Sequence, residues 1–384
     1  MKLIYWIILL IVILGIIIMY FIVNRVLTPD HIENYLVGGN NKKVCNLVGK
    51  KHAGHGGSEA IILITGSKPK RVYKIFPNFT YKLWGNPKEA TKYNLQAFAT
   101  EINICKKLTS ELVDTGITPH IVRYLGDSYC EDPQQFFNDC PKSYTKFLKS
   151  KNNEIHCENY YRSHPIKALQ KKCKIVELEY CDYSAAEFIG DIIKLPIRDI
   201  KRALDVFIFQ IIITVQLIKV KYPQFSHNDL FIRNILGQKI TNKRFDYEYD
   251  GIKYRVEAHK FNPKINDFGL SNLSEKYKQT TILVDNDYKD IYLFILDIYH
   301  NISDRFWYNQ KARDKKIMNK KKFKSIRDYF NTFFDINKIE EFTEKHPRQM
   351  YWNWNQTLDP EFVKIIKVKH PDWLLKNYFN IFAV

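Results

Sequence analysis

The first feature of the hydrophobic pattern is an unbroken apolar run close to the start of the chain. Residues Leu3 to Val23 read LIYWIILLIVILGIIIMYFIV and include no charged side chain. A helix of this length rises about 30 Å, which matches the hydrocarbon core of a bilayer. The run is too long for a cleaved signal peptide, and no small-residue cleavage site follows it. The pattern therefore predicts a transmembrane anchor over residues 1–24.

Flanking charge predicts the orientation of this anchor. Only Lys2 precedes the apolar run, whereas a group of cations follows it: Arg25, Lys42, Lys43, Lys50 and Lys51. Because the positively charged side of a span tends to stay in the cytoplasm, we expect the bulk of the chain to be cytoplasmic. Residues 25–43, which include Pro29 and Gly38-Gly39, predict a short tether.

Alternating apolar positions then predict a strand-rich half. The expected strands lie within Val44–Ile64, on both sides of a glycine cluster, and at Arg71–Phe76, His120–Gly126 and Lys174–Tyr180. Between them, Glu89–Leu108 has the spacing of an amphipathic helix. The polar stretch 128–172 is predicted to be an insert between two strands.

From Arg198 onward the pattern becomes helical. The segment from Arg198 to Val220 is apolar almost all round, which is typical of a buried central helix. Its internal Arg and Asp residues make it a poor second membrane span. Most of the chain after Asp285 also has helical spacing. A strand-rich half followed by a helix-rich half predicts an α+β protein with two lobes.

Net charge and cysteine content indicate the binding partners and the cellular compartment to expect. The net charge of +18 favours binding to polyanions, which could be nucleic acid, ATP, acidic substrates or anionic lipid. The seven cysteines form no C-x-x-C pair, which fits a reducing compartment. The basic run Lys311–Asp328 either docks on an anionic partner or is a solvated helix face. It has no pattern of aromatic residues on which bases could stack, so no specific nucleic-acid binding is predicted.

The strongest chemical signal is the segment HNDLFIRNIL, which runs from His227 to Leu236. It places Asp229 and Asn234 five residues apart, directly after the long buried helix. A carboxylate can orient an acceptor hydroxyl and take its proton, and an amide oxygen can bind Mg²⁺. A second segment, KINDFGLSN, supplies another carboxylate at Asp267.

Together the two segments resemble the catalytic loop and the metal-binding D-F-G element of protein kinases. The resemblance covers Val44 to His300 and is closest to the divergent serine/threonine-protein kinases encoded by large DNA viruses. It implies a two-lobed kinase fold, with an N-lobe at 44–181 and a C-lobe at 182–384. It also implies ATP and Mg²⁺, or Mn²⁺, as cofactors. Asp229 would then be the catalytic carboxylate, and Asn234 and Asp267 the metal ligands.

The resemblance extends upstream to a lysine and a glutamate. Lys74 in the segment VYKI resembles the strand lysine that grips the α- and β-phosphates of ATP. A buried lysine needs a carboxylate partner to stay charged and fixed. Glu101 resembles the helix glutamate that supplies it, with Glu89 as a rival.

Backbone groups complete the expected ATP site. Gly54, Gly56 and Gly57 stand where a kinase covers the phosphates, although the third family glycine is replaced or absent. The segment Leu178 to Asp182 resembles the kinase hinge. The resemblance implies that backbone groups of Glu179 and Cys181 bind adenine.

The spacing departs from the family between the two motifs. Asp229 and Asp267 are 38 residues apart, about twice the usual gap. The extra residues, 239–263, predict a β-hairpin that turns at Asp250-Gly251. Asp246 in FDYEY is a rival metal ligand, because choline and ethanolamine kinases combine an HND loop with a similar element. We favour Asp267, since Asp-Gly between alternating aromatics is a strong hairpin signal.

A second departure concerns regulation and substrate. No A-P-E tripeptide follows the D-F-G element, and Asp290, which resembles a buried family aspartate, comes only 23 residues after Asp267. Asn228 replaces the arginine that normally pairs with a loop phosphate. These departures predict a kinase that loop phosphorylation does not switch, and they leave three functions open. The chain is a serine/threonine-protein kinase, a small-molecule kinase of the choline or ethanolamine type, or an inactive kinase-fold scaffold.

The expected partners follow from these features. They are a protein substrate phosphorylated on Ser or Thr near a membrane, and a lipid bilayer contacted through residues 3–23. The expected location is a single-pass membrane protein with its kinase domain on the cytoplasmic side, in a host or virion membrane if the protein is viral. The basic C-terminal region is predicted to be helical.

Overall fold

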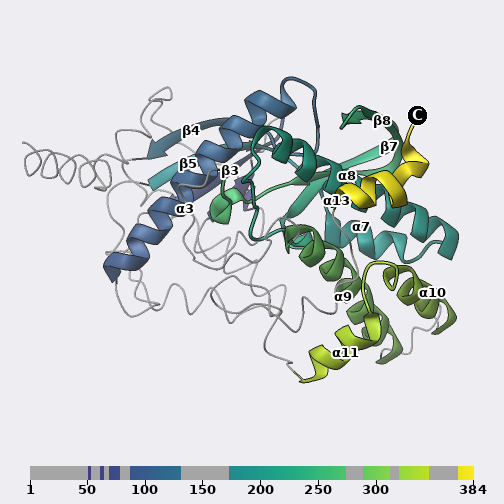
Figure 1. The fold of residues 1–384 in the computed structure, drawn as a ribbon. Helices are drawn as coiled ribbons and strands as arrows, with labels where there is room; N and C mark the ends of the chain where they lie inside the picture. The colour runs from purple at the N-terminus through teal and green to yellow at the C-terminus, as the bar shows by residue number, and fades with distance from the viewer. Residues whose placement is uncertain are drawn as a thin grey trace, which may run out of the picture. The chain divides into compact units, whose positions relative to one another are not determined.

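The computed structural model describes residues 51–52, 61–64, 69–77, 87–130, 173–273, 289–311, 320–345 and 371–384, and Figure 1 draws them as a ribbon. The predicted membrane anchor and tether, the glycine cluster and nearly all of the insert lie outside the described residues. The chain divides into two compact units. The first comprises Met1–Ile102 and Leu125–Leu178, and the second comprises Asn103–Tyr124 and Glu179–Val384.

The first unit is built on a five-stranded sheet with the order β1-β2-β3-β5-β4. Its strands are β1 (Lys51–His52), β2 (Ile61–Ile64), β3 (Arg71–Pro77), β4 (Tyr124–Cys130) and β5 (Cys173–Glu179). Strands β2 and β3 are antiparallel, with Ile62 opposite Lys74. Helix α3 (Pro87–Leu108) follows β3 in the chain. This register fixes the position of Lys74 on the central strand of the sheet.

One strand boundary differs from the predicted one. The pattern at His120–Gly126 predicts a strand, but β4 begins at Tyr124. The preceding backbone is bonded elsewhere, because Ile265 N donates to His120 O at 2.8 Å and Val122 N donates to Ile265 O at 3.0 Å. The apolar residues of this segment therefore belong partly to an isolated β-bridge between Ile121 and Ile265 in the second unit, and partly to strand β4.

The second unit is mainly helical. Its helices are α7 (Ala185–Ile192), α8 (Ile197–Lys221), α9 (Lys289–Lys311), α10 (Lys320–Phe330) and α11 (Ile336–Lys345). A three-stranded sheet has the order β6-β7-β8, with β6 at Tyr183–Ser184, β7 at Ile235–Tyr249 and β8 at Ile252–Ile265. The chain ends in α13 (Pro371–Trp373), a π-helical turn at Leu374–Tyr378 and a 3-10 turn at Phe379–Phe382. The content of the two units confirms the predicted α+β class.

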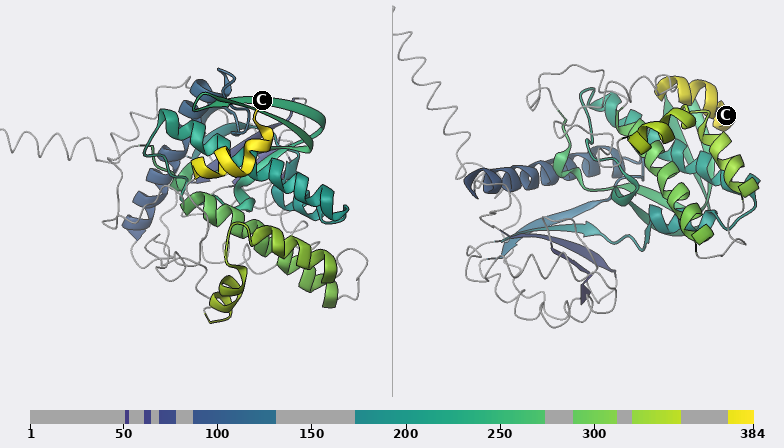
Figure 2. Two further views of the ribbon diagram at one scale, coloured as in Figure 1. Left: turned by 45° about the vertical axis from the view of Figure 1, so that its right-hand side comes forward. Right: turned by 90° about the horizontal axis from the view of Figure 1, so that it is seen from below.

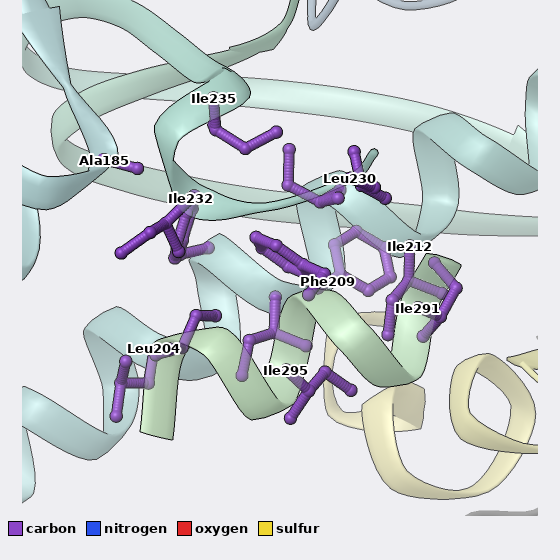
Figure 3. Close-up of a cluster of buried hydrophobic side chains, with 14 of the residues drawn as sticks. Ala185, Leu204, Phe209, Ile212, Leu230, Ile232, Ile235, Ile291 and Ile295 are labelled. Atoms are coloured by element: carbon purple, nitrogen blue, oxygen red, sulfur yellow. The ribbon is translucent and has the colours of Figure 1, made fainter. Parts of the chain in front are cut away.

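Helix α8 is the centre of the second unit. By length and composition alone it could cross a membrane, yet 78% of its most apolar stretch is buried inside the protein. Figure 3 shows side chains from several elements around it, among them Phe209 and Ile212 of α8, Leu230 of the following loop and Ile295 of α9. All four are fully buried. Helix α8 is therefore apolar on nearly all sides because it lies in the hydrophobic core. The same core supports the loop that follows the helix.

Strands β7 and β8 form the long hairpin that the sequence predicts. Asp250 and Gly251 turn the chain with φ values of 50° and 72°, as a two-residue hairpin turn with positive φ requires. One face of the hairpin packs on α8, and its outer face pairs opposite charges across the strands, with Arg244 opposite Glu257 and Glu248 opposite Lys253. These pairs give a solvated outer face with little net charge.

The C-terminal segment, residues 371–384, packs against the hairpin of β7 and β8. Tyr254 forms a bridge with Ala383, and Val384 N donates to Lys253 O at 2.9 Å. Phe379 is fully buried and its ring lies 5.6 Å from that of Phe209. In both views of Figure 2 this yellow segment lies beside the second unit's hairpin and helices. The last residues of the chain are thus part of the folded core.

Candidate active site

The loop after α8 presents Asp229 with two side-chain partners. Asn234 Nδ2 donates to Asp229 Oδ2 at 2.6 Å and to the Asp229 carbonyl at 2.8 Å. Arg233 donates to Asp229 Oδ1 at 2.5 Å, and its guanidinium lies 4.5 Å from the centre of the Phe231 ring. The short turn Ile232–Asn234 brings these groups together before β7 begins. The carboxylate of Asp229 is therefore held in one orientation.

Two carboxylates from α9 hold the backbone of this loop. Asp290 accepts the N–H of His227 at 2.6 Å and the N–H of Asn228 at 2.9 Å. Asp297 accepts the N–H of Ile232 at 2.7 Å. Asn228 has a φ of 63°, a left-handed conformation that an asparagine tolerates better than most residues. Because each bond fixes a backbone group, the loop is anchored on both sides of Asp229.

Burial and charge act in opposite directions on Asp229. Desolvation raises the pKa of its carboxyl above the ordinary value, and the nearby Arg233 charge and the Asn234 hydrogen bond lower it. The desolvation effect is the largest of these causes. A carboxylate with a raised pKa is a better proton acceptor than an exposed one. The environment therefore suits Asp229 to accept a proton from an acceptor hydroxyl.

Asp267 lies next to this loop with an unusual backbone conformation. Its φ and ψ are 65° and 69°, in the left-handed region. The following Phe268 is fully buried, with its ring 5.2 Å from that of His227. The residue before, Asn266, donates its N–H to Asn234 O at 2.9 Å. A left-handed aspartate costs free energy and persists only where its surroundings fix it, so the position is held by the packing of its neighbours.

The donor set of Asn234 and Asp267 fits a magnesium ion. Mg²⁺ prefers oxygen ligands and is usually bound by one or two protein groups, with waters and substrate phosphates completing the shell. The Asn234 amide nitrogen is committed to Asp229, which leaves its carbonyl oxygen as the group that can bind a metal. Within the described part of the chain, no three His, Cys, Asp or Glu side chains gather as a metal cluster.

In the first unit, Lys74 and Glu101 form a buried ion pair. Lys74 Nζ lies 2.8 Å from both carboxylate oxygens of Glu101. The side chains are 11% and 1% exposed. A bidentate arrangement of this kind keeps a lysine charged and fixed in a desolvated place. The structure thus pairs Lys74 with Glu101; the side chain of the rival Glu89 lies outside the description.

The hinge segment has an ion pair that sequence reasoning missed. Glu179 Oε1 accepts Lys264 Nζ at 2.7 Å and the N–H of Arg123 at 2.6 Å. Glu179 N also donates to Arg123 O at 3.0 Å. Burial raises the pKa of the neighbouring Cys181 thiol to about 12, so this cysteine is a neutral thiol at physiological pH. Arg123 therefore holds the backbone of Glu179, while the Glu179 side chain binds both Arg123 and Lys264.

The rival metal ligand Asp246 lies apart from the catalytic loop's hydrogen bonds. It is on the exposed outer face of the hairpin, where Arg255 Nε is 2.7 Å and Arg244 Nε is 3.4 Å from its carboxylate. The charge of Arg255, through its hydrogen bond, lowers the pKa of the Asp246 carboxyl. Cross-strand charge pairing accounts for Asp246 without a metal. The predicted glycines Gly54, Gly56 and Gly57 lie outside the described residues.

The sequence gives a partial signal for two charged residues of the site. Arg233 stands four residues after Asp229, a spacing that the short turn converts into a contact. Lys264 stands three residues before Asp267 on a buried strand, where an unpaired lysine would be costly. Both signals depend on knowing which carboxylate lies opposite, and the sequence does not contain that information.

The fold of the two units fits an enzyme of the protein-kinase class. No family model matches the chain. It is 28% identical over 369 residues to a protein of Acanthamoeba polyphaga mimivirus that is provisionally named a serine/threonine-protein kinase; the match covers 86% of this chain and 88% of that protein. A second protein of the same virus and the same provisional name is 30% identical over 137 residues, or 36% of this chain and 28% of that protein.

These similarities confirm the predicted resemblance. The chain is similar to two viral proteins provisionally named serine/threonine-protein kinases, and this similarity supports a protein-kinase-type enzyme. The longer match spans most of both proteins, so the similarity is not confined to one short segment.

Proposed function

We propose that the chain is a membrane-anchored protein kinase that uses ATP and Mg²⁺ to phosphorylate Ser and Thr hydroxyls. The observation that carries the proposal is Asp229, a part-buried carboxylate oriented by Asn234 and Arg233 in a loop anchored by Asp290. The serine/threonine specificity rests on the names of the two viral relatives.

Each residue of the candidate site would have its own role in phosphate transfer. Asp229 orients the acceptor hydroxyl and accepts its proton through a carboxylate oxygen. Lys74, fixed by Glu101, supplies a positive charge to the phosphates of ATP. Asn234 and Asp267 would hold the metal through oxygen atoms. Backbone groups at Glu179 and Cys181 would contact adenine. Mg²⁺, when bound, neutralises phosphate charge as it develops during transfer.

The small-molecule alternative rests on the missing A-P-E tripeptide and on the FDYEY segment. The FDYEY segment is the weaker support for a small-molecule kinase, because its Asp246 is paired with arginines on the outer face of the hairpin. The scaffold alternative requires that the polar residues of the site be dispensable. The ion pair of Lys74 and the anchoring of Asp229 favour an active kinase over the scaffold, and the names of the two viral relatives favour a protein acceptor over a small molecule.

The acceptor can be identified with labelled ATP. The full chain, purified in nanodiscs, would be given γ-labelled ATP, Mg²⁺ and either a protein mixture or choline and ethanolamine. We expect label on phosphoserine and phosphothreonine, and none when Asp229 is replaced by Asn. Label on choline or ethanolamine alone would refute the protein-kinase proposal. ATP binding without any transfer would favour the scaffold.

Membrane anchoring through residues 3–23, with the kinase domain in the cytoplasm, is a separate part of the proposal. Four sequons, beginning at Asn78, Asn272, Asn301 and Asn355, report on this orientation. Expression in a eukaryotic cell should give a membrane-bound protein whose mass does not change on treatment with a glycosidase. A glycosidase-sensitive mass would place the domain in the secretory lumen instead, and a protein recovered without membranes would refute the anchor.

A further inference from the structure

We propose that the second unit carries a docking site for a linear peptide that combines apolar side chains with flanking acidic residues. The site is a cavity of about 250 Å³ lined by residues of α7, α8 and β8. None of the lining residues belongs to the catalytic loop. The inference rests on the proposed function, because it assigns a protein substrate or partner to the same enzyme.

The floor of the cavity is aromatic. Phe188 of α7, Phe207 of α8 and Phe261 of β8 line it and contact one another, with ring centroids 4.8 to 5.7 Å apart. At its inner end, Gln210 Nε2 lies 3.3 Å from the Tyr247 hydroxyl. Because these side chains already have fixed partners, the cavity is preformed rather than opened by a ligand.

The rim of the cavity carries Arg202 and Lys260. Both are exposed, and neither forms a salt bridge within the part of the chain that the structure describes. One carboxylate, Asp199, also lines the cavity, and the charge of Arg202 acts on the nearby Asp205. Asp199 pairs with Arg198, and Asp205 accepts the Tyr329 and Tyr378 hydroxyls. A pair of cations above an aromatic floor is complementary to an apolar side chain next to a carboxylate.

The backbone is strained at Lys260. Lys260 has a φ of 70°, beside the point where the register of β7 and β8 shifts. Such a conformation is uncommon for a residue other than glycine and is retained where its surroundings require it. Arg202 lies with Arg198 and Lys201 in the first turns of α8. Cations there oppose the helix dipole, which favours acids at that end.

The size of the cavity favours a peptide over a small molecule. Sites for whole small molecules usually occupy about 300–1,000 Å³ and bury most of the ligand. This cavity is smaller and has two exposed cations among its lining residues, so it suits one or two apolar side chains of an extended segment. A docking site apart from the catalytic loop would also give a protein substrate a means of recognition that does not need the A-P-E element.

The test is a binding measurement on the full chain in nanodiscs of neutral lipid. The probe is a fluorescent peptide with two Leu residues flanked by Glu and Asp, compared by anisotropy with versions carrying Lys for the acids or Ser for the Leu residues. We expect the acidic Leu peptide to bind about tenfold more tightly than either version. Arg202→Glu and Lys260→Glu should each weaken it about fivefold, and Ala203→Trp, which fills the cavity, should abolish binding.

Lys324→Glu, which changes an exposed lysine of α10 outside the cavity, is the matched control and should leave binding unchanged. Equal binding of the three peptides, or equal loss in the control, would overturn the proposal. Binding of short-chain phosphatidylserine that Arg202→Glu weakens, without peptide binding, would assign the site to lipid instead. Label transfer to a short generic peptide should persist in the Arg202, Lys260 and Ala203 variants. If transfer persists while the probe fails to bind, only the docking proposal is wrong.

Discussion

At the scale of single residues, the account depends on two carboxylates and their cations. Asp229 is oriented by Arg233 and Asn234, and Glu101 is bound to Lys74. The sequence predicts Asp229, Asn234, Lys74 and Glu101 because each belongs to a short segment of characteristic residue types. It does not predict Arg233 at Asp229, because that contact depends on the geometry of the loop.

The charge of Arg233 should be visible in the pH dependence of transfer. Transfer requires ionised Asp229, so the rate should fall as the pH decreases through its raised pKa. Since the guanidinium lowers that pKa, Arg233→Ala should move the acid limb of kcat to higher pH, while Arg233→Lys should move it less. An acid limb that stays in place in Arg233→Ala would show that another group controls it.

The pair of Lys74 and Glu101 allows stability and activity to be separated. Glu101→Ala leaves a buried lysine without its carboxylate, so the free energy of unfolding should fall by about 3–5 kcal/mol. The double variant Lys74→Met, Glu101→Leu removes both charges and should recover much of that loss in a denaturant titration. Both proteins should nevertheless be inactive. Transfer activity in the stable double variant would contradict the role of Lys74.

At the scale of elements, the hairpin and the helix beneath it are the best-predicted part of the fold. Aromatic alternation and Asp250-Gly251 predict both strands and the turn. The sequence does not show what lies under the hairpin, where His120 Nδ1 is 2.8 Å from the Pro263 carbonyl and Nε2 is 2.6 Å from the Tyr247 hydroxyl. These contacts join residues more than a hundred positions apart, so no local pattern contains them.

Buried His120 should make the protein sensitive to acid. Burial lowers its pKa from 6.5 to about 3, so the folded protein keeps it neutral. Its contribution is complete above pH 6.5 and is lost as the pH falls from there towards 3, by about 1.4 kcal/mol per pH unit. His120→Asn should be less stable at neutral pH but lose less stability between pH 6.5 and 5. Parallel stability curves for the two proteins would show that His120 is not the group responsible.

At the scale of the whole molecule, the C-terminal segment was the least predictable part. Residues 346–370 lie outside the described structure, and the following fourteen carry no motif. Their aromatic residues nevertheless pack on α8 and on the hairpin, where Tyr249 donates its hydroxyl to Asp372 at 2.6 Å. Sequence patterns indicate that such residues are buried somewhere, but not which element they cover.

Removal of residues 371–384 should therefore destabilise the second unit. Leu374, Leu375 and Phe379 are almost fully buried, and burial of each side chain contributes about 1.5–3 kcal/mol. Their sum approaches the total stability of an ordinary domain. We expect the truncated chain to aggregate or to lose hydrogen-exchange protection in β7 and β8. A truncated chain with native protection in that hairpin would show that the segment is dispensable.

The central claim is that Asp267, rather than Asp246, serves phosphate transfer together with Asp229. It is tested most directly by the rate of γ-phosphate transfer from ATP in two matched variants, Asp267→Asn and Asp246→Asn, each at saturating Mg²⁺. The account predicts a loss of at least about a hundredfold for Asp267→Asn and a change within about twofold for Asp246→Asn, which only removes an exposed charge pair. Loss of transfer in Asp246→Asn, with activity retained in Asp267→Asn, would contradict the account.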